Sequence, residues 1–248
     1  MAARPDRRVI VVADPAELAS RAAERVLARI AENSGRVAIC LAGGSSPKQL
    51  YSLLVTEPYR SRIPWQRVHW FIGDERFVPA NDPLNNMGMA RRLLLDQCAP
   101  ASNIHPIPTD TGNPNESALR YARELESFYG AEGLRPERPL FDIVLLGVGP
   151  DGHTASLFPD DPALEEAGRW VVGVPQAHVA PFVPRVTLTL PALGSCREML
   201  FEAAGSDKRA ILTRLLAGEN LPANRARATG ETVWLVDKAA VPENPGDR

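Results

Sequence analysis

The sequence predicts a three-layer α/β/α fold on a mostly parallel, Rossmann-like central sheet. Along its 248 residues, short apolar or β-branched runs alternate with amphipathic, helix-like segments, a pattern typical of parallel sheets covered by helices. The links between these segments are short. One run, residues 141–146, is apolar over nearly its whole length, as expected of a strand that is buried on both faces.

The first strand is expected at residues 9–12, and a helix follows it. Asp14 can cap this helix, Pro15 suits its first position and Glu17 can reach back to the cap. Apolar residues recur every four positions and form one face: Leu18, Ala22, Val26 and Ile30. Gly35 is expected to end the helix.

The remaining elements continue the alternation. Further strands are expected at 36–42, 68–72, 141–146, 170–174, 186–190, 199–203 and 233–236. Further helices are expected at 47–55, 86–98, 116–129 and 206–217, and the Pro-rich stretch 100–114 is expected to be a loop. We expect one domain over residues 1–248, with residues 1–7 and 242–248 loose at its ends.

Composition argues for a soluble globular protein. Apolar residues make up 44% and charged residues 23%, and the net charge is −2. This balance argues against a general nucleic-acid or membrane-surface binder, although it allows a local basic pocket for a small anion. The basic start is followed by only one short apolar run, 9–12, too short for a signal peptide or membrane span, so a cytoplasmic protein is expected.

The cysteines and most histidines give no sign of a metal or redox centre. Cys40, Cys98 and Cys196 are far apart and have no ligand or redox spacing, so we expect free thiols. His69 and His178 lack neighbours that suggest chemistry and are interpreted as structural or surface residues. We expect no metal and no cofactor.

The segment 41–50 follows a strand and opens a helix. Gly43 and Gly44 let the backbone approach a ligand, while Ser45, Ser46 and the free N–H groups before Pro47 can hold a phosphate. The spacing is neither the Walker motif nor the dinucleotide fingerprint. A plain strand-to-helix turn explains the segment equally well.

A second polar segment, 73–79, also follows a strand. Asp74, Glu75 and Arg76 are either a solvated loop or the wall of a polar pocket. Solvated loops are commoner. The position of the segment favours a pocket wall, because the carboxyl ends of parallel strands share one edge of the sheet, where ligands bind.

The third and most informative segment, 147–159, runs from a buried strand into a glycine-rich turn that contains His153. Histidine has the side-chain pKa best suited to proton transfer near neutral pH. The alternative is a turn whose histidine bonds only to the backbone. Asp151 can orient the ring, but spacing alone leaves this open.

Two cations follow later strands. Arg185 begins the expected strand 186–190, and Lys208 lies in the first turn of the helix 206–217. A cation is unfavourable at a helix N-terminus unless it meets an anion there. Pairing with Asp207 is the ordinary explanation for Lys208. Together the segments supply anion-binding groups, a candidate base and a carboxylate, as a phosphorylated small-molecule substrate requires.

These motifs, in this order and over nearly the whole chain, resemble the 6-phosphogluconolactonases of the glucosamine-6-phosphate isomerase/6-phosphogluconolactonase family. The segment 146–159 matches the family signature almost letter for letter, and 43–47, 74–79, 85–90, 184–189 and 205–208 resemble its other motifs. Ser46 stands where the family usually has threonine, and Ala42 and Asn85 where serine is common. The resemblance implies a fold similar to the glucosamine-6-phosphate deaminase and ribose-5-phosphate isomerase group.

The resemblance implies cofactor-free hydrolysis of 6-phospho-D-glucono-1,5-lactone to 6-phospho-D-gluconate, in the pentose phosphate pathway, by a monomer or weak homodimer. His153 would be the general base, and Asp74 would lie in the pocket and orient Arg76 or a sugar hydroxyl. The residues implied to contact substrate are Gly43, Gly44, Ser45, Arg76, Gly152, Arg185 and Lys208. The division of phosphate contacts among the cations stays open, as does the choice of oxyanion donors between the Gly44 turn and the 149–152 turn.

Two alternatives remain. The first is a deaminase of amino-sugar phosphates, which shares a similar histidine turn but normally continues it with an Asn-Glu pair; here Thr154 and Ala155 follow. The second is a sugar-phosphate sensor domain of a transcription regulator. That class needs a helix-turn-helix partner, and only a few residues precede the first strand.

Overall fold

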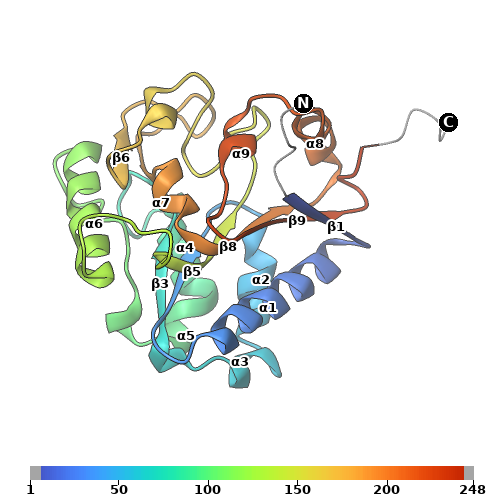
Figure 1. Cartoon of the computed structure of the whole chain (residues 1–248), viewed down its shortest axis with the longest axis horizontal. Helices are drawn as coiled ribbons and strands as arrows, with labels where there is room; N and C mark the ends of the chain where they lie inside the picture. The colour runs from blue at the N-terminus through green and yellow to red at the C-terminus, as the bar shows by residue number, and fades with distance from the viewer. Residues whose placement is uncertain (1–6, 243–248) are drawn as a thin grey trace.

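Residues 7–242 are described by the computed structural model, and a parallel sheet of six strands forms their centre (Figure 1). In spatial order the strands are β1 (Arg7–Val12), β9 (Glu231–Asp237), β8 (Cys196–Ala203), β5 (Phe141–Leu146), β2 (Val37–Leu41) and β3 (Val68–Ile72). Strands β2 and β5 are buried along their whole length, as expected where helices cover both faces. The predicted fold class is confirmed.

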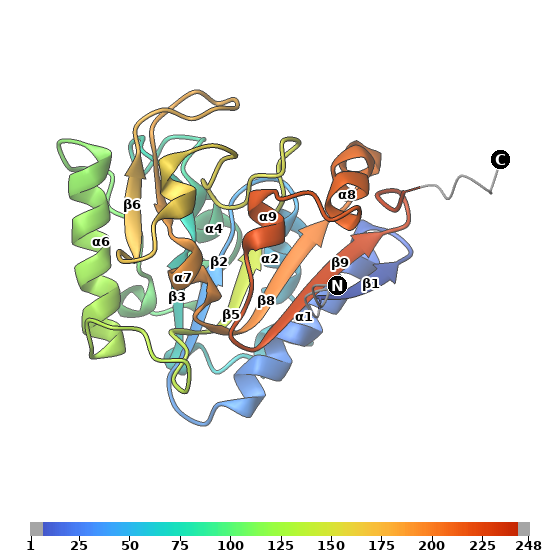
Figure 2. The same cartoon turned by 45° about the horizontal axis from the view of Figure 1, so that its top comes forward.

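The helices lie on both sides of this sheet (Figure 2). On one face, α1 (Pro15–Glu32) packs against α2 (Pro47–Leu54), and the other face carries α7 (Leu190–Gly194), α8 (Arg209–Leu216) and α9 (Pro222–Arg225). The remaining helices are α3 (Tyr59–Arg62), α4 (Asn86–Ala90), α5 (Asp96–Cys98) and α6 (Pro114–Tyr129). The predicted helix 86–98 is one helical segment whose middle, Arg91–Leu95, is π-helical.

The start of α1 forms as its sequence predicts. Asp14 Oδ1 accepts hydrogen bonds from the N–H groups of Ala16 and Glu17, both at 2.9 Å. Glu17 in turn accepts from the N–H of Ala13 at 2.8 Å. These bonds satisfy N–H groups that the helix itself leaves unpaired. The predicted apolar face is buried, and the helix ends at Glu32, before Gly35.

A smaller antiparallel sheet lies beside the main one and contains residues 74–76. Its order is β4 (Asp74–Arg76), β7 (Arg185–Leu188) and β6 (Val171–Val174), with Asp74 opposite Thr187 and Arg76 opposite Arg185. The segment, expected to be either a solvated loop or the wall of a polar pocket, is a short strand, and its residues Asp74 and Arg76 line a cavity. Its pairing partner lies about a hundred residues away, which local sequence cannot reveal.

The two chain ends were expected to be loose. Residues 1–6 and 243–248 lie outside the described residues. Arg7, which that expectation included, belongs to β1 and pairs with Thr232 of β9. The expectation is therefore wrong for Arg7, because the parallel ladder with β9 holds it.

The strand order creates one point at which neighbouring connections lead in opposite directions. The chain continues from β2 to β3 on one side, whereas β5 continues to β8 on the other. The ladder between β2 and β5 is short, joining Ile39 to Ile143 and Cys40 to Val144. Open α/β sheets bind ligands in the crevice beyond such a switch point.

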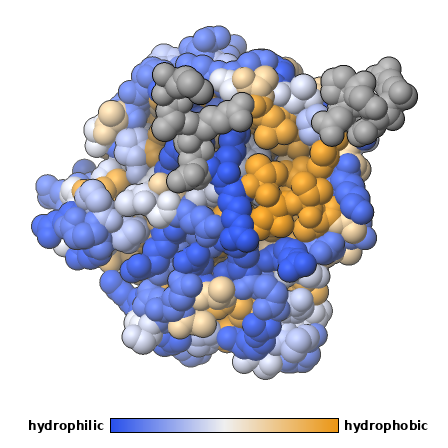
Figure 3. Space-filling view, turned by 45° about the vertical axis from the view of Figure 1, so that its right-hand side comes forward, coloured by the Kyte–Doolittle hydropathy of each residue, from blue (hydrophilic) through white to orange (hydrophobic). Residues whose placement is uncertain are grey.

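The β1 end of the sheet carries an apolar surface (Figure 3). Val9 and Val11 of β1 are 42% and 51% exposed, and Leu216 of α8 is 49% exposed. They surround a hollow together with Leu212 and Trp234. None of the helices in the described part of the chain has the length and apolarity to cross a membrane.

Candidate active site

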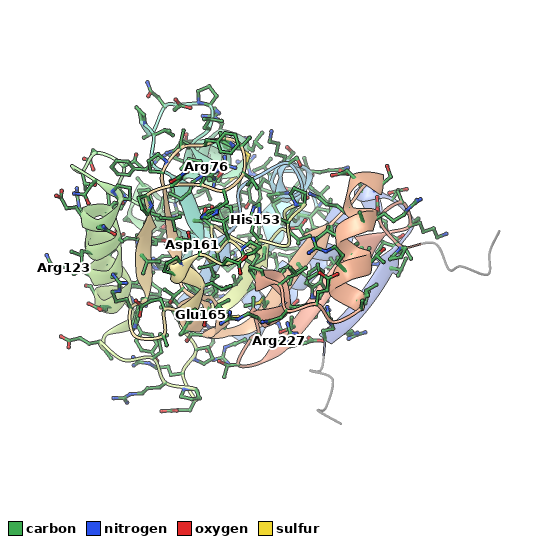
Figure 4. All side chains as sticks on the ribbon, turned by 90° about the horizontal axis from the view of Figure 1, so that it is seen from above. Arg76, Arg123, His153, Asp161, Glu165 and Arg227 are labelled. Atoms are coloured by element: carbon green, nitrogen blue, oxygen red, sulfur yellow. The ribbon has the colours of Figure 1, made fainter. Side chains whose placement is uncertain are left out.

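A cavity of about 370 Å³ opens where β2 and β5 diverge. It draws its walls from the segments that leave β2, β3 and β5, together with residues of β7 and the segment before α8. The predicted site residues that line it are Gly43, Gly44, Ser45, Asp74, Arg76, His153, Arg185 and Lys208. Figure 4, which views the molecule from above, shows His153 near the centre and Arg123 on the outer flank.

The turn after β2 has the geometry of an anion site. Gly44 has φ +89°, and a side chain at Gly43 would lie 2.1 Å from Asn86 Oδ1, so both positions require glycine. Within residues 7–242, the backbone N–H groups of Gly43, Gly44, Ser45 and Ser46 donate to no other group. They lie at the N-terminus of α2, where the helix dipole favours a negative charge.

The turn after β5 holds His153 in a defined orientation. Nδ1 of His153 lies 2.5 Å from Oδ1 of Asp151, and the same oxygen accepts the His153 N–H at 3.1 Å. The ring packs against Phe158, with centroids 4.9 Å apart, and against Gly149, where a Cβ would lie 2.0 Å from the imidazole. Nε2 bonds to no residue in the described part of the chain. The orienting role of Asp151, left open by the sequence, fits this geometry.

The Asp151 carboxylate stays charged beside the ring. Burial opposes its ionisation, but the hydrogen bond and the charge of His153 outweigh burial, so the pKa of Asp151 lies below its ordinary value. A charged Asp151 accepts the Nδ1 proton, which leaves Nε2 as the basic nitrogen that faces the cavity. This is the arrangement that a general base requires.

Asp74 lines the cavity, as expected, and its carboxylate bonds to a serine rather than to Arg76. The hydroxyl of Ser156 donates to its Oδ2 at 2.6 Å, and its backbone carbonyl accepts from the Asn86 amide at 3.0 Å. Arg76 instead donates from Nη1 to the carbonyl of Leu84 at 2.9 Å. Among the described residues, no hydrogen bond joins Asp74 to Arg76, so Asp74 is free to meet a polar group of a ligand.

Glu75 joins β4 to the start of α4 at the edge of the cavity. It is fully buried and accepts the N–H groups of Arg76, Asn86 and Met87 at 2.6–2.8 Å. Burial raises the pKa of Glu75 to about 7, although these three bonds oppose the shift. Asn86 therefore reaches the cavity from a fixed helix start. Asn86 was not among the predicted site residues, and its place in the 85–90 motif was the signal that pointed to it.

Two further cations reach the cavity from later elements. The Arg185 guanidinium is buried and donates to the carbonyls of Val183 at 3.1 Å and Pro181 at 2.8 Å. Burial lowers the pKa of Arg185, partly opposed by the charge of Asp74. Lys208 donates to the Val148 carbonyl at 3.1 Å, which places its charge over the turn after β5.

Gly152 is the predicted site residue that the structure places outside the cavity lining. It has φ +90°, and a Cβ there would lie 2.8 Å from Leu221. Glycine is thus required at this position by the backbone and by packing. Its N–H donates to the Gly149 carbonyl at 3.0 Å, and that of Gly149 donates to the His153 carbonyl at 2.9 Å.

The other sequence expectations concern groups away from the cavity. His178 bonds to Asp161 at 3.0 Å on the surface, and His69 lies beside His105. Cys40, Cys98 and Cys196 are free thiols, as predicted. Within residues 7–242, no cluster of three or more His, Cys, Asp or Glu side chains is arranged to hold a metal ion.

Comparison with known proteins identifies the family. Residues 13–234 match the model of the family described as glucosamine-6-phosphate isomerases/6-phosphogluconolactonase. The chain belongs to this family. The 6-phosphogluconolactonase of Synechocystis is 40% identical over 222 residues, which cover 87% of this chain and 88% of the relative. The resemblance inferred from the motifs is therefore confirmed.

Solved structures agree. The 6-phosphogluconolactonase from Trypanosoma cruzi is 30% identical and superposes with a TM-score of 0.84, covering 95% of this chain and 96% of that one. A monomeric glucosamine-6-phosphate deaminase has a TM-score of 0.79 at 18% identity, over 94% of this chain and 98% of that one. The second likeness concerns the fold alone.

Proposed function

We propose that this family member is a lactone hydrolase that converts 6-phospho-D-glucono-1,5-lactone and water into 6-phospho-D-gluconate. One observation carries the proposal: an imidazole oriented by a carboxylate faces the same cavity as the cations Arg76, Arg185 and Lys208. The relatives named 6-phosphogluconolactonase support the choice of substrate.

His153 acts as the general base. Its Nε2 takes a proton from a water molecule as the water oxygen attacks the lactone carbonyl carbon. Asp151 stabilises the imidazolium that forms. The tetrahedral intermediate then collapses, the ring C–O bond breaks, and the imidazolium returns its proton to the leaving alkoxide. Water thus supplies the new carboxyl oxygen, and the carboxylic acid releases the second proton of the water to solvent to become the carboxylate.

The far end of the cavity holds the phosphate. The free N–H groups of the 43–46 turn, with Arg185 and Lys208, provide donors and positive charge, and Arg76 lies near the same pocket. A phosphate held there places the lactone carbonyl beside His153, and positioning of this kind can supply several kcal/mol of the rate acceleration. Asp74 receives a sugar hydroxyl and Ser156 fixes its orientation.

The oxyanion needs donors that are not already used. The N–H groups of Gly149 and Gly152 donate within their own turn. These two N–H groups are therefore not available to the developing oxyanion.

A wider set of expectations accompanies this function. We propose that the enzyme is a single domain, a monomer or weak homodimer, that it acts in the cytoplasm without cofactor, and that it binds neither nucleic acid nor membranes. The net charge of −2 supports the last point. Light scattering at micromolar concentration tests the oligomeric state.

A coupled assay with freshly prepared lactone, corrected for spontaneous opening, tests the function. We expect rapid formation of 6-phosphogluconate, and much slower turnover of unphosphorylated 1,5-gluconolactone because the phosphate contacts are lost. Ammonia release from glucosamine 6-phosphate without lactonase activity would instead identify a deaminase. Tight binding of 6-phosphogluconate without turnover would identify a sensor.

A further inference from the structure

Two buried tyrosine hydroxyls lie beneath the loops that form the cavity. Tyr51 of α2 and Tyr121 of α6 are both fully buried. Each hydroxyl bonds to the N–H and the C=O of a single residue at the carboxyl end of a strand. For Tyr51 that residue is Ala42, and for Tyr121 it is Ile72. The proposed mechanism uses neither tyrosine.

Ala42 needs such a partner because of its place in the sheet. It follows the last residue of β2, beyond the ladder with β3, which ends at Leu41 and Ile72, and beyond the ladder with β5, which ends at Cys40 and Val144. The Tyr51 oxygen accepts the Ala42 N–H at 3.0 Å and donates to the Ala42 carbonyl at 2.8 Å. Without it, two backbone groups would lie unpaired beside the cavity.

The contact between Tyr51 and Ala42 fixes the position from which the 43–46 turn starts. Gly43 follows Ala42 directly, and the 43–46 turn leads into the helix that carries Tyr51. The hydroxyl thus ties the first turns of α2 back to the strand end and closes a loop around the turn. On its other side, Gly43 packs against the Asn86 amide. The glycine turn, which is flexible by composition, is held at both ends.

Tyr121 makes the corresponding contact one strand away. β3 is the edge strand of the main sheet, and on its outer side the Trp70 carbonyl accepts the His105 N–H at 2.8 Å, two residues before Ile72. The Tyr121 hydroxyl lies 3.2 Å from both the N–H and the C=O of Ile72. The residues that follow are Gly73 and then Asp74–Arg76 of β4.

We propose that Tyr51 is a positioning residue for the anion-binding turn, and that Tyr121 has the same role for the Asp74–Arg76 segment. Both hydroxyls hold a strand end in place so that the following loop meets the substrate already ordered. Preorganised donors bind more tightly because less conformational entropy is lost on binding. The kinetic part of this inference rests on the proposed function, whereas the structural part does not.

The structural part is tested by amide hydrogen exchange on the free protein. Tyr51→Phe should accelerate exchange in residues 42–46, and Tyr121→Phe should accelerate it in residues 72–76. Tyr129→Phe is the matched control, because the Tyr129 hydroxyl also joins a backbone N–H and C=O, those of Arg135 and Arg138, away from the cavity. Unchanged exchange of residues 42–46 in Tyr51→Phe would overturn the proposal.

Kinetics and ligand binding separate positioning from general stability. With Tyr51→Phe, the KM for the phosphorylated lactone and the Kd for inorganic phosphate should rise about fivefold, the effect of one ordinary hydrogen bond, while kcat stays nearly unchanged. Tyr129→Phe should leave all three constants unchanged. An equal fall in kcat with no change in either KM or Kd would contradict the proposal.

If Tyr51→Phe does not fold, amide exchange in the unaltered protein tests the role of Tyr51. The Ala42 amide should be as protected as that of Ile39 inside the ladder, and rapid exchange at Ala42 would overturn the proposal. If the unaltered protein has no lactonase activity, the proposed function fails, and the exchange data alone decide the role of Tyr51.

Discussion

Two histidine–carboxylate pairs in this protein have nearly the same hydrogen bond and opposite surroundings. His153 Nδ1 lies 2.5 Å from Asp151, and His105 Nδ1 lies 2.7 Å from Glu124. The second nitrogen of His153 faces a cavity. That of His105 bonds to His69 at 3.0 Å.

The surroundings also differ in charge and access. The His105 ring stacks on Phe71, with centroids 4.3 Å apart and an interplanar angle of 7°, so Phe71 covers one of its faces. The cavity beside His153 is lined by three cations. The proposed catalytic role of His153 therefore depends on a second ring nitrogen that a strand end leaves open beside the three cations.

The largest difference between the two pairs is expected when each histidine is removed in turn. His153→Ala should lower kcat by about 10²–10⁴, the usual contribution of a general base, while 6-phosphogluconate still binds. His105→Ala should leave kcat within about twofold and affect only stability. Steady-state kinetics and calorimetric binding measure both. Full activity in His153→Ala would end the general-base assignment.

The next largest effect is expected from crowding the ring. A methyl group at Gly149 would collide with the imidazole, so Gly149→Ala should displace His153 and lower kcat by up to about a hundredfold, as small misplacements of catalytic groups do. Gly133→Ala is the matched control, since nothing lies within 4 Å of a Cβ there. Equal activity of the two variants would show that the ring position is not critical.

Exchange of the carboxylates should have a smaller effect. Asp151→Asn keeps the shape but removes the charge that stabilises the imidazolium, so kcat should fall about tenfold, the kinetic equivalent of a hydrogen bond to a charged group. Glu124→Gln, the same change beside His105, should leave kcat unaltered. Assays at neutral pH compare the two, and an unchanged kcat in Asp151→Asn would remove Asp151 from the mechanism.

The smallest effect concerns stability at the second pair. Burial, with the charges of His105 and Arg36, lowers the pKa of His69 to about 4. The unfolded chain binds this proton at its ordinary pKa near 6.5, so stability is present above that value and is lost as pH falls toward 4. In thermal unfolding experiments, the stability of His69→Gln should fall less steeply with pH over this range than that of the unaltered protein. An identical slope would contradict the lowered pKa of His69.

Local sequence was enough to predict the units that build the cavity. The run at 141–146 and the glycine turn after it place His153 at a strand end, and the Gly43–Ser46 turn follows from Pro47 at the start of α2. Parallel strands then bring these turns to one edge. Charge and glycine patterns close to a strand are thus sufficient to find most of the lining.

The remaining features depend on contacts between distant segments. Asp74 meets Ser156, which lies 82 residues further along the chain, and the packing of Leu221 adds to the backbone conformation in requiring glycine at position 152. The antiparallel pairing of β4 with β7 and the hydrogen bond between Tyr121 and Ile72 are also long-range. None of these contacts has a local pattern, because each arises from packing in three dimensions.

The central claim is that one cavity holds the phosphate at its cationic end and the reacting carbon beside His153. A crystal structure with bound 6-phosphogluconate tests it most directly. We expect the C1 carboxylate within about 2.6–3.2 Å of His153 Nε2, with the phosphate on the 43–46 turn, Arg185 and Lys208. Product bound with its phosphate at His153, or outside this cavity, would contradict the account.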